Sequence, residues 1–437
     1  MIGMRQSLYS RLIKSDDEAL SAMPAAARKE VPGNALRLIG AHSLQSTGDQ
    51  IVNPSTVLPW LLTSLGAPAW IIALLLPVRE SGSMLPQAAL TPWVLRSRYR
   101  KWIWVAGGAG QAVAVAAMAM TAAIGNGTAA GIAILVELVA FALSRSLCSI
   151  ASKDVQGRTM PKGQRGQING ISALVSGIVA VTVGLTIRIA GGTEVNTDIL
   201  AGLLGISALI WVGALIVYAS VCEPAGEPHT QDGTQGWLAR SWQLLTSDRA
   251  FRRFVIVRSL LLVSSLSPPF IVIIASAEGA SGLSGLGPFL IASGLAGIVG
   301  GRLSGRLADR SSRRVMIWGS GLSSLVIVLV IGVAAAPGFD GGTWLFPLAF
   351  FSLALTHLAV RVARKTYVVD MAEGDQRTEY VAVSNTAMGV LLLVAGGVSS
   401  ALAHFGTDAA LLFLALLGVL GVFVGRSLPE VSHGATS

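Results

Sequence analysis

The sequence predicts an all-α membrane protein of twelve transmembrane helices, arranged as two pseudo-symmetric six-helix bundles. The 437 residues have a mean hydropathy of +0.65. Only 13% of them are charged, against about 25% in an ordinary soluble domain. A helix needs about 20 apolar residues to cross a bilayer, so the chain has room for roughly a dozen spans and for no large domain outside the membrane.

Twelve apolar runs, separated by charges or by clusters of Gly, Pro and Asn, are the predicted spans. The first six lie near residues 38–63, 68–93, 102–124, 129–150, 168–191 and 199–220. Six more lie near 254–277, 285–305, 315–336, 343–363, 380–404 and 408–425. The chain therefore divides into an N-terminal segment 1–35, a first bundle 36–221, a linker loop 222–253, a second bundle 254–426 and a tail 427–437.

Basic residues near the ends of the spans indicate the orientation, because Lys and Arg are retained on the cytoplasmic side. They cluster after spans two, four, eight and ten, whereas the loops on the opposite side contain no Lys or Arg. We therefore expect both termini and the linker loop in the cytoplasm. The expected location is the inner (plasma) membrane of a bacterium.

The two bundles carry traces of an internal duplication. At an offset of 212 residues, Lys153 matches Lys365 and Arg165 matches Arg377. Seven identities at this offset fall in the 40 positions from 145 to 184. Paired halves of this kind are typical of transporters built from two six-helix repeats.

The end of span eight carries a charged motif, which reads Gly305-Arg306-Leu307-Ala308-Asp309-Arg310-Ser311-Ser312-Arg313-Arg314. It resembles the loop signature of the major facilitator superfamily, with Ser312 where the family has Gly. The resemblance implies a gating motif formed by Gly305, Arg306, Asp309, Arg310, Arg313 and Arg314. In that family the acidic residue meets a helix terminus of the other half, here the start of span five, where the helix dipole stabilises a carboxylate by about 0.3 to 1 kcal/mol. The alternative is a local ion pair between Asp309 and Arg313.

Charges deep inside predicted spans indicate a coupling site, because a charge near the midplane costs at least about 2.5 to 3.5 kcal/mol. Asp49 lies eleven residues into span one, and Arg79 lies eleven residues into span two from the other side. Both are therefore roughly 17 Å deep and can meet. Glu80 follows Arg79 in the proline-containing stretch 77–86. One acid is expected to hold Arg79 and the other to titrate; the alternative is a closed ion pair that only locks spans one and two together.

Other polar residues in the spans complete the candidate site. Glu137, about 12 Å below the outer end of span four, is a second candidate proton carrier, because its apolar neighbours favour the protonated form. The expected residues of a solute cavity are Gln45, Asn53, Ser81, Ser264, Ser267, Arg258 and His357. Arg258 also has a simpler explanation as an interfacial arginine, like Arg361. For His357 the simpler explanation is a histidine that only packs within the bundle.

Glycines recur at every fourth residue in span eight, at Gly297, Gly301 and Gly305. Small residues at this spacing allow two helices to approach closely in lipid. We therefore expect this stripe to face a neighbouring helix.

These patterns favour a secondary transporter that moves a small solute by alternating access, with protons as the coupling ion at Asp49, Arg79 and Glu80. Two alternatives stay open, a carrier of lipid-like amphiphiles and a membrane receptor or scaffold that does not transport. An enzyme is not expected, because the sequence has no nucleophile with a neighbouring base, no metal-ligand cluster and no nucleotide-binding glycine loop. The expected partners are a small-molecule substrate, protons and the lipid bilayer. We expect no cofactor, no nucleic acid and a monomeric state.

Overall fold

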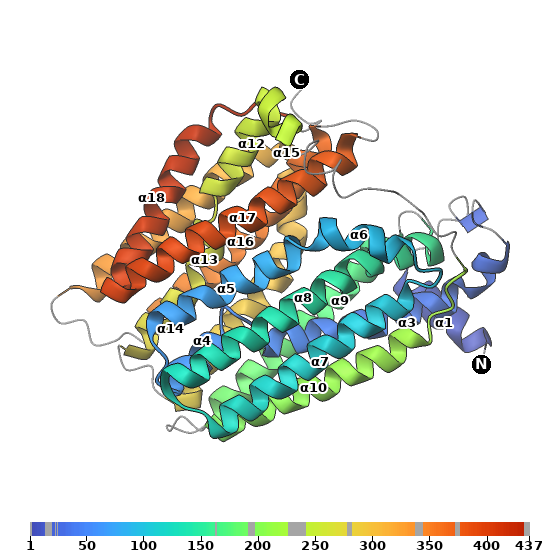
Figure 1. Ribbon diagram of the computed structural model, residues 1–437, viewed down its shortest axis with the longest axis horizontal. Helices are drawn as coiled ribbons and strands as arrows, with labels where there is room; N and C mark the ends of the chain where they lie inside the picture. Colours follow the sequence, from blue (N-terminus) through green and yellow to red (C-terminus); the bar gives the residue numbers. More distant parts are fainter. Residues whose placement is uncertain are drawn as a thin grey trace.

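A computed structural model of the chain describes residues 2–13, 20–21, 23, 25–161, 164–190, 197–225, 242–277, 282–336, 344–371 and 376–431. The regular structure in these ranges is entirely helical, which confirms the predicted fold class. Figure 1 shows two groups of helices, α3 to α10 in one and α12 to α18 in the other. The groups meet at the end that carries α4 and α14 and diverge towards the end that carries both termini (Figure 1).

Proline interrupts the first two predicted spans. The helices of the first half are α1 (Ile2–Leu12), α3 (Ala25–Ile51), α4 (Val57–Ser64), α5 (Ala69–Met84), α6 (Gln87–Leu95), α7 (Lys101–Ile124), α8 (Gly127–Thr159), α9 (Gln164–Ala190) and α10 (Thr197–Ala219). Pro54 lies between α3 and α4, and Pro86 lies between α5 and α6. A proline has no N–H for the helical hydrogen bond, so each of these spans is made of two shorter helices.

The second half repeats this break in its own first span. Its helices are α12 (Arg249–Leu260), α13 (Val263–Leu266), α14 (Pro268–Ala277), α15 (Gly282–Ala334), α16 (Leu345–Asp370), α17 (Gln376–Phe405) and α18 (Thr407–Gly425). Helix α15 contains predicted spans eight and nine, joined by a kink at Ser311 where φ is −164° and ψ is 95°. The charged motif of span eight therefore lies on a kinked helix and not in a separate loop.

Eight helical segments in the described ranges are long and apolar enough to cross a membrane. They correspond to predicted spans three, four, six, seven and nine to twelve. The other four predicted spans fall on the broken pairs α3 with α4 and α5 with α6, on α9, and on the first part of α15. These four are shorter, interrupted or more polar, so the total of twelve stays a prediction.

The two halves approach each other closely at glycines. A Cβ placed on Gly294 of α15 would lie 2.8 Å from the carbonyl oxygen of Gly177 in α9. A Cβ placed on Gly396 of α17 would overlap the ring of Pro77 in α5. Glycine at Gly294 and Gly396 is therefore what allows α15 to lie against α9 and α17 to lie against α5.

The predicted glycine stripe of span eight was wrong for Gly297 and Gly301. Both are exposed, and a Cβ on either would have no neighbour within 4 Å. Helix α15 turns a different face to α9, the one that carries Gly294. The surroundings of Gly305 lie outside the part of the chain that the structure describes.

Asp248 caps the N-terminus of α12. Its carboxylate accepts the backbone N–H groups of Ala250 at 2.8 Å and Phe251 at 3.0 Å, and the hydroxyl of Tyr380. Burial raises the pKa of Asp248, but the hydrogen bonds from Tyr380, Phe251 and Ala250 outweigh burial and hold this pKa below its ordinary value. The stabilisation is therefore complete above the pKa of the unfolded chain and is lost as the pH falls through the lowered pKa of the folded protein.

We expect Asp248→Ala to lower the free energy of unfolding by about 1 kcal/mol at neutral pH, because it removes the helix cap. The difference from the parent should shrink as both are acidified towards about pH 3. Thermal unfolding of the purified proteins across this range measures it. Asp408→Ala is a matched control, since Asp408 also begins a helix but makes no described capping bond. A loss of stability as large in the control would contradict the assigned role.

Candidate functional site

Asp49 lies at the centre of an ion cluster that joins α3, α5 and α8. Its carboxylate is 3.1 Å from Nη2 of Arg79 and 2.7 Å from Nη1 of Arg145. Arg79 also places Nη1 3.1 Å from Oε1 of Glu80. The side chains of Asp49 and Arg79 are only 16% and 14% exposed. The contact expected from the equal depth of these two residues is present, and we call the four residues the Asp49 cluster.

Arg145 is the member of the Asp49 cluster that the sequence analysis missed. Span four was expected to end near residue 150, which places Arg145 close to the membrane surface, where an arginine can reach the headgroups. The guanidinium group of Arg145 instead reaches the carboxylate of Asp49 on α3, so Arg145 lies inside the bundle. The internal repeat could have drawn attention to Arg145. At the offset of 212 residues Arg145 matches His357, which is another polar residue inside a predicted span.

A cavity of about 210 Å³ lies beside the Asp49 cluster, between the two halves. We call it the central cavity, and its volume is far above the roughly 10 to 15 Å³ that one water needs. The broken spans one and seven supply Asn53, Ser55, Ser264, Ser265 and Pro268, and the other lining residues are Leu76, Glu80, Ser293, Ala296, Gly297, Phe350, Ala354, His357, Leu358 and Arg361. Glu80 therefore belongs both to the cavity wall and to the Asp49 cluster.

Three residues predicted for the solute cavity line the central cavity, namely Asn53, Ser264 and His357. The hydroxyl of Ser264 and Nδ1 of His357 have no hydrogen-bond partner among the described residues. His357 therefore lies in the cavity wall, and its role in binding a solute stays a prediction. Arg361, expected at the membrane interface, also lines the cavity.

Four other predicted cavity residues do not line the central cavity. Ser267 donates to the carbonyl oxygen of Val263 at 2.5 Å, as a serine in a helix often does. Arg258 donates to Ser384 at 2.8 Å and Asn385 at 3.0 Å, which ties α12 to α17. The remaining two lie away from the cavity wall, Ser81 fully buried in α5 and Gln45 half-buried on α3.

Glu137 stands apart from the Asp49 cluster. Its carboxylate accepts the hydroxyl of Thr121 in α7 at 2.7 Å. It lies eight residues before Arg145 on α8, which is about 12 Å along the helix. A role for Glu137 as a proton carrier stays a prediction.

The charged motif of α15 contacts the C-terminal segment. Nη1 of Arg313 donates to the carbonyl oxygen of Leu428 at 2.9 Å, and its Nε lies 3.7 Å from Glu430. The two neighbouring arginines, Arg310 and Arg314, are exposed. The side chains of Arg306 and Asp309 lie outside the described part of the chain, and so does the expected contact of Asp309 with span five.

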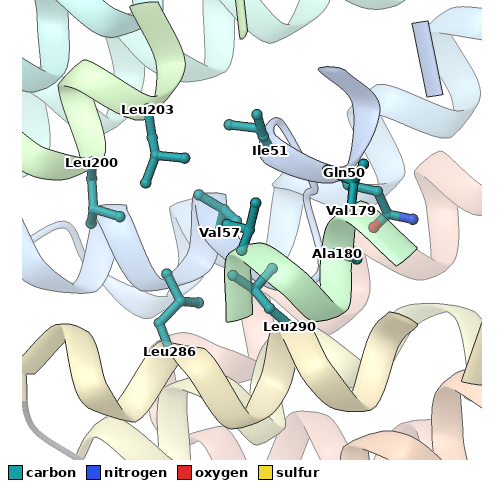
Figure 2. Close-up of a pocket in the computed structure, with 10 residues that line it drawn as sticks. Gln50, Ile51, Val57, Val179, Ala180, Leu200, Leu203, Leu286 and Leu290 are labelled. Carbon is teal, nitrogen blue, oxygen red and sulfur yellow. The ribbon is translucent and has the colours of Figure 1, made fainter. Parts of the chain in front are cut away.

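Figure 2 shows a second cavity between the halves, formed by α3, α4, α9, α10 and α15. Its volume is about 10 Å³, and its lining is apolar apart from Gln50. The residues are Gln50, Ile51, Val57, Val179, Ala180, Val183, Leu200, Leu203, Leu286 and Leu290. It holds at most one water, so it is a packing gap and not a solute site.

The family model of the Major Facilitator Superfamily matches residues 290–436, while no curated protein sequence matches the chain. Among solved structures, a POT family transporter in complex with a thioalcohol-conjugated peptide has a TM-score of 0.71 and 10% identity, over 93% of this chain and 98% of that one. A D-xylose–proton symporter has a TM-score of 0.66 and 13% identity, over 92% and 97%. A mutant of the nucleoside transporter NupG has a TM-score of 0.65 and 13% identity, over 90% and 99%. At these identities the similarity shows a shared fold.

Proposed function

We propose that this chain is a member of the major facilitator superfamily and a secondary transporter, which carries a small solute by alternating access and couples its movement to protons. The observation that carries the proposal is the position of Glu80. This acid lines the central cavity and shares Arg79 with Asp49. A proton on Glu80 therefore changes both the cavity wall and the contacts between spans.

The geometry supports Glu80 as the acid that takes the proton. Asp49 is held by two guanidinium groups, those of Arg79 and Arg145, whereas Arg79 is the one cation within ion-pair distance of Glu80 among the side chains that the structure describes. Protonation of Glu80 frees one side of Arg79, which then remains with Asp49. Because this buried cation loses one of its two partners, the proton is linked to the Asp49–Arg79 ion pair that joins α3 to α5.

The arrangement of the halves supports an inward-facing state. At the closed end, the hydroxyl of Ser400 in α17 donates to the carbonyl oxygen of Trp70 in α5 at 2.7 Å. The halves diverge towards the end that carries the termini (Figure 1), which the distribution of Lys and Arg assigns to the cytoplasm. The central cavity then opens to the cytoplasm.

Reconstitution into liposomes tests the function. A thermal-shift screen of the purified protein against metabolites and drugs finds a ligand, because a ligand stabilises the folded state by mass action. We expect that ligand to cross the membrane with a change of internal pH, and Glu80→Gln to exchange the ligand without moving protons. Asp408→Asn, at the outer end of α18, should behave as the parent. Proton movement that survives in Glu80→Gln contradicts the assignment, and binding without any movement of the ligand identifies a receptor.

Reporter fusions test the expected orientation of the chain in the membrane. A phosphatase fused after Ser437 should be inactive in bacterial cells, because that end is cytoplasmic, and one inserted near Gly341 should be active. An enzyme reporter that works only in the cytoplasm should give the reverse pattern. An active phosphatase at Ser437 would overturn the orientation.

A further inference from the structure

We propose that the transported solute is an organic anion and that Arg361 of α16 binds its carboxylate or phosphate group. The proposal rests on the transport function proposed above and adds the class of substrate. Arg361 lines the central cavity, and its side chain is exposed there. Among the described side chains, no carboxylate lies within ion-pair distance of it.

The acids near Arg361 already have partners. Arg361 lies within electrostatic reach of Glu80, but also of Arg79 and Arg145. These two arginines and the two acids of the Asp49 cluster balance each other, two charges against two. The charge of Arg361 is therefore left over, and a bound anion would compensate it.

Arg364 adds a second uncompensated cation one turn further along α16. It is 7% exposed, and its described polar contact is Nη1 to the sulfur of Met388 at 3.8 Å. It lies within electrostatic reach of Arg361. Two unpaired guanidinium groups deep in a membrane protein are costly to keep, and together they favour a ligand of opposite charge.

The positive charge continues beyond Arg361 towards the diverging end of the halves. Lys365 is exposed and lies within electrostatic reach of Arg361 and of Lys153 on α8. The acid next to Lys153, Asp154, is already in ion pairs with Arg100 and Arg158. A cleft lined by one sign of charge concentrates ions of the other sign, so this route attracts anions.

The rest of the central cavity fits a molecule with one charged end. The guanidinium fork of an arginine matches the paired oxygens of a carboxylate or phosphate. His357 lies four residues before Arg361, on the same face of α16, and the unpartnered hydroxyl of Ser264 is 1% exposed. Leu76, Phe350 and Leu358 supply an apolar wall. The expected substrate is thus a small organic acid or phosphate ester with an apolar body.

Labelling of one cysteine measures the charge preference of the cavity without knowledge of the solute. The cysteine replaces Ser293, a cavity residue of α15, in a chain whose Cys148 and Cys222 are changed to Ser. Reaction rates are measured with an anionic and a cationic methanethiosulfonate reagent, each divided by its rate with a free thiol. We expect the anionic reagent to be preferred by about tenfold or more, and Arg361→Gln to remove most of this preference.

Arg426→Gln is the matched control, since Arg426 is an exposed arginine directly after α18 that does not line the central cavity. It should keep the preference of the parent. Equal rates for the two reagents in the parent overturn the proposal, whether or not the Arg361 variant folds. A preference that persists in Arg361→Gln overturns the role of Arg361.

Protection of the same cysteine identifies the charged group. Phenyl phosphate, 4-phenylbutyrate and the uncharged 4-phenylbutanamide are compared at about 10 mM, above the usual range of KM. Slower labelling with the phosphate alone assigns a phosphate site, and slower labelling with the carboxylate assigns a carboxylate site. Equal protection by the amide, or no protection by either anion, overturns the proposal.

Failure of this proposal and failure of the transport function look different. A chain that prefers the anionic reagent but exchanges no ligand across liposomes binds anions and does not transport. A chain that moves an uncharged solute, with no preference between the reagents, is a transporter of another substrate class.

Discussion

Replacement of Arg79 with Ala is expected to abolish proton-coupled transport and to lower the free energy of unfolding by about 3 to 5 kcal/mol. The change removes the cation that Asp49 and Glu80 share at 3.1 Å each. Glu80 then has no described ion-pair partner, and the link between the proton and the contact of α3 with α5 is lost. Denaturant unfolding and proton flux in liposomes measure the two effects. Arg98→Ala, at an exposed arginine without a described ion pair, is the matched control and should change neither.

The double change of Asp49→Asn with Arg79→Gln separates a coupling role from a structural one. It replaces two buried charges with neutral groups of similar size, so it should recover part of the lost stability. Transport coupled to protons should stay absent. If the neutral pair moves protons as the parent does, the Asp49 cluster is only a lock between spans.

Gly294→Val is expected to shift the protein away from the state with a closed outer end. The added side chain meets the backbone of α9, where a Cβ would already lie 2.8 Å from the carbonyl oxygen of Gly177. Overpacking of this kind costs about 1 to 3 kcal/mol, and about 1.4 kcal/mol changes a population ratio tenfold. A single cysteine in place of Ser400, which is 6% exposed at the contact with α5, should therefore react faster with a thiol reagent added from outside.

Gly301→Val is the control for this experiment, since it adds the same side chain to the same helix. A Cβ at Gly301 has open space around it. The control should leave the labelling rate at residue 400 unchanged. Equal rates in Gly294→Val and Gly301→Val would show that contact at Gly294 does not hold the outer end closed.

The sequence predicts those contacts of the site that follow from how deep each residue lies in the membrane. Asp49 and Arg79 were each expected eleven residues inside a span, and the structure brings them into contact. Arg145 was missed because it lies only five residues before the expected end of span four, whereas its side chain turns inwards to Asp49. Arg361 was assigned to the membrane surface on the same grounds. It lines the central cavity between the halves, and the sequence of one span does not show where two halves leave a space between them.

Some predictions assumed which face of a helix points to the cavity or to a neighbouring helix. These predictions failed where the helix is broken or packs through another face. Ser267 was grouped with Ser264, but Pro268 follows it and its hydroxyl bonds to Val263. The glycine spacing in span eight indicated the right helix for a close contact and the wrong glycines. Which face of a helix meets a neighbour depends on the other helix as well, and the sequence of one span does not contain that information.

The length of α8 has a consequence for the proposed capture of an anionic solute. Its 33 residues measure about 50 Å, whereas the hydrocarbon core of a bilayer is about 30 Å thick. We therefore expect the exposed Lys153, near the C-terminal end of α8, to stand beyond the lipid tails, where its field decays over a screening length of about 8 Å at physiological ionic strength. The rate of solute entry should accordingly fall as salt is added, while the equilibrium at the deeper Arg361 responds much less, so that capture and binding are separable by ionic strength.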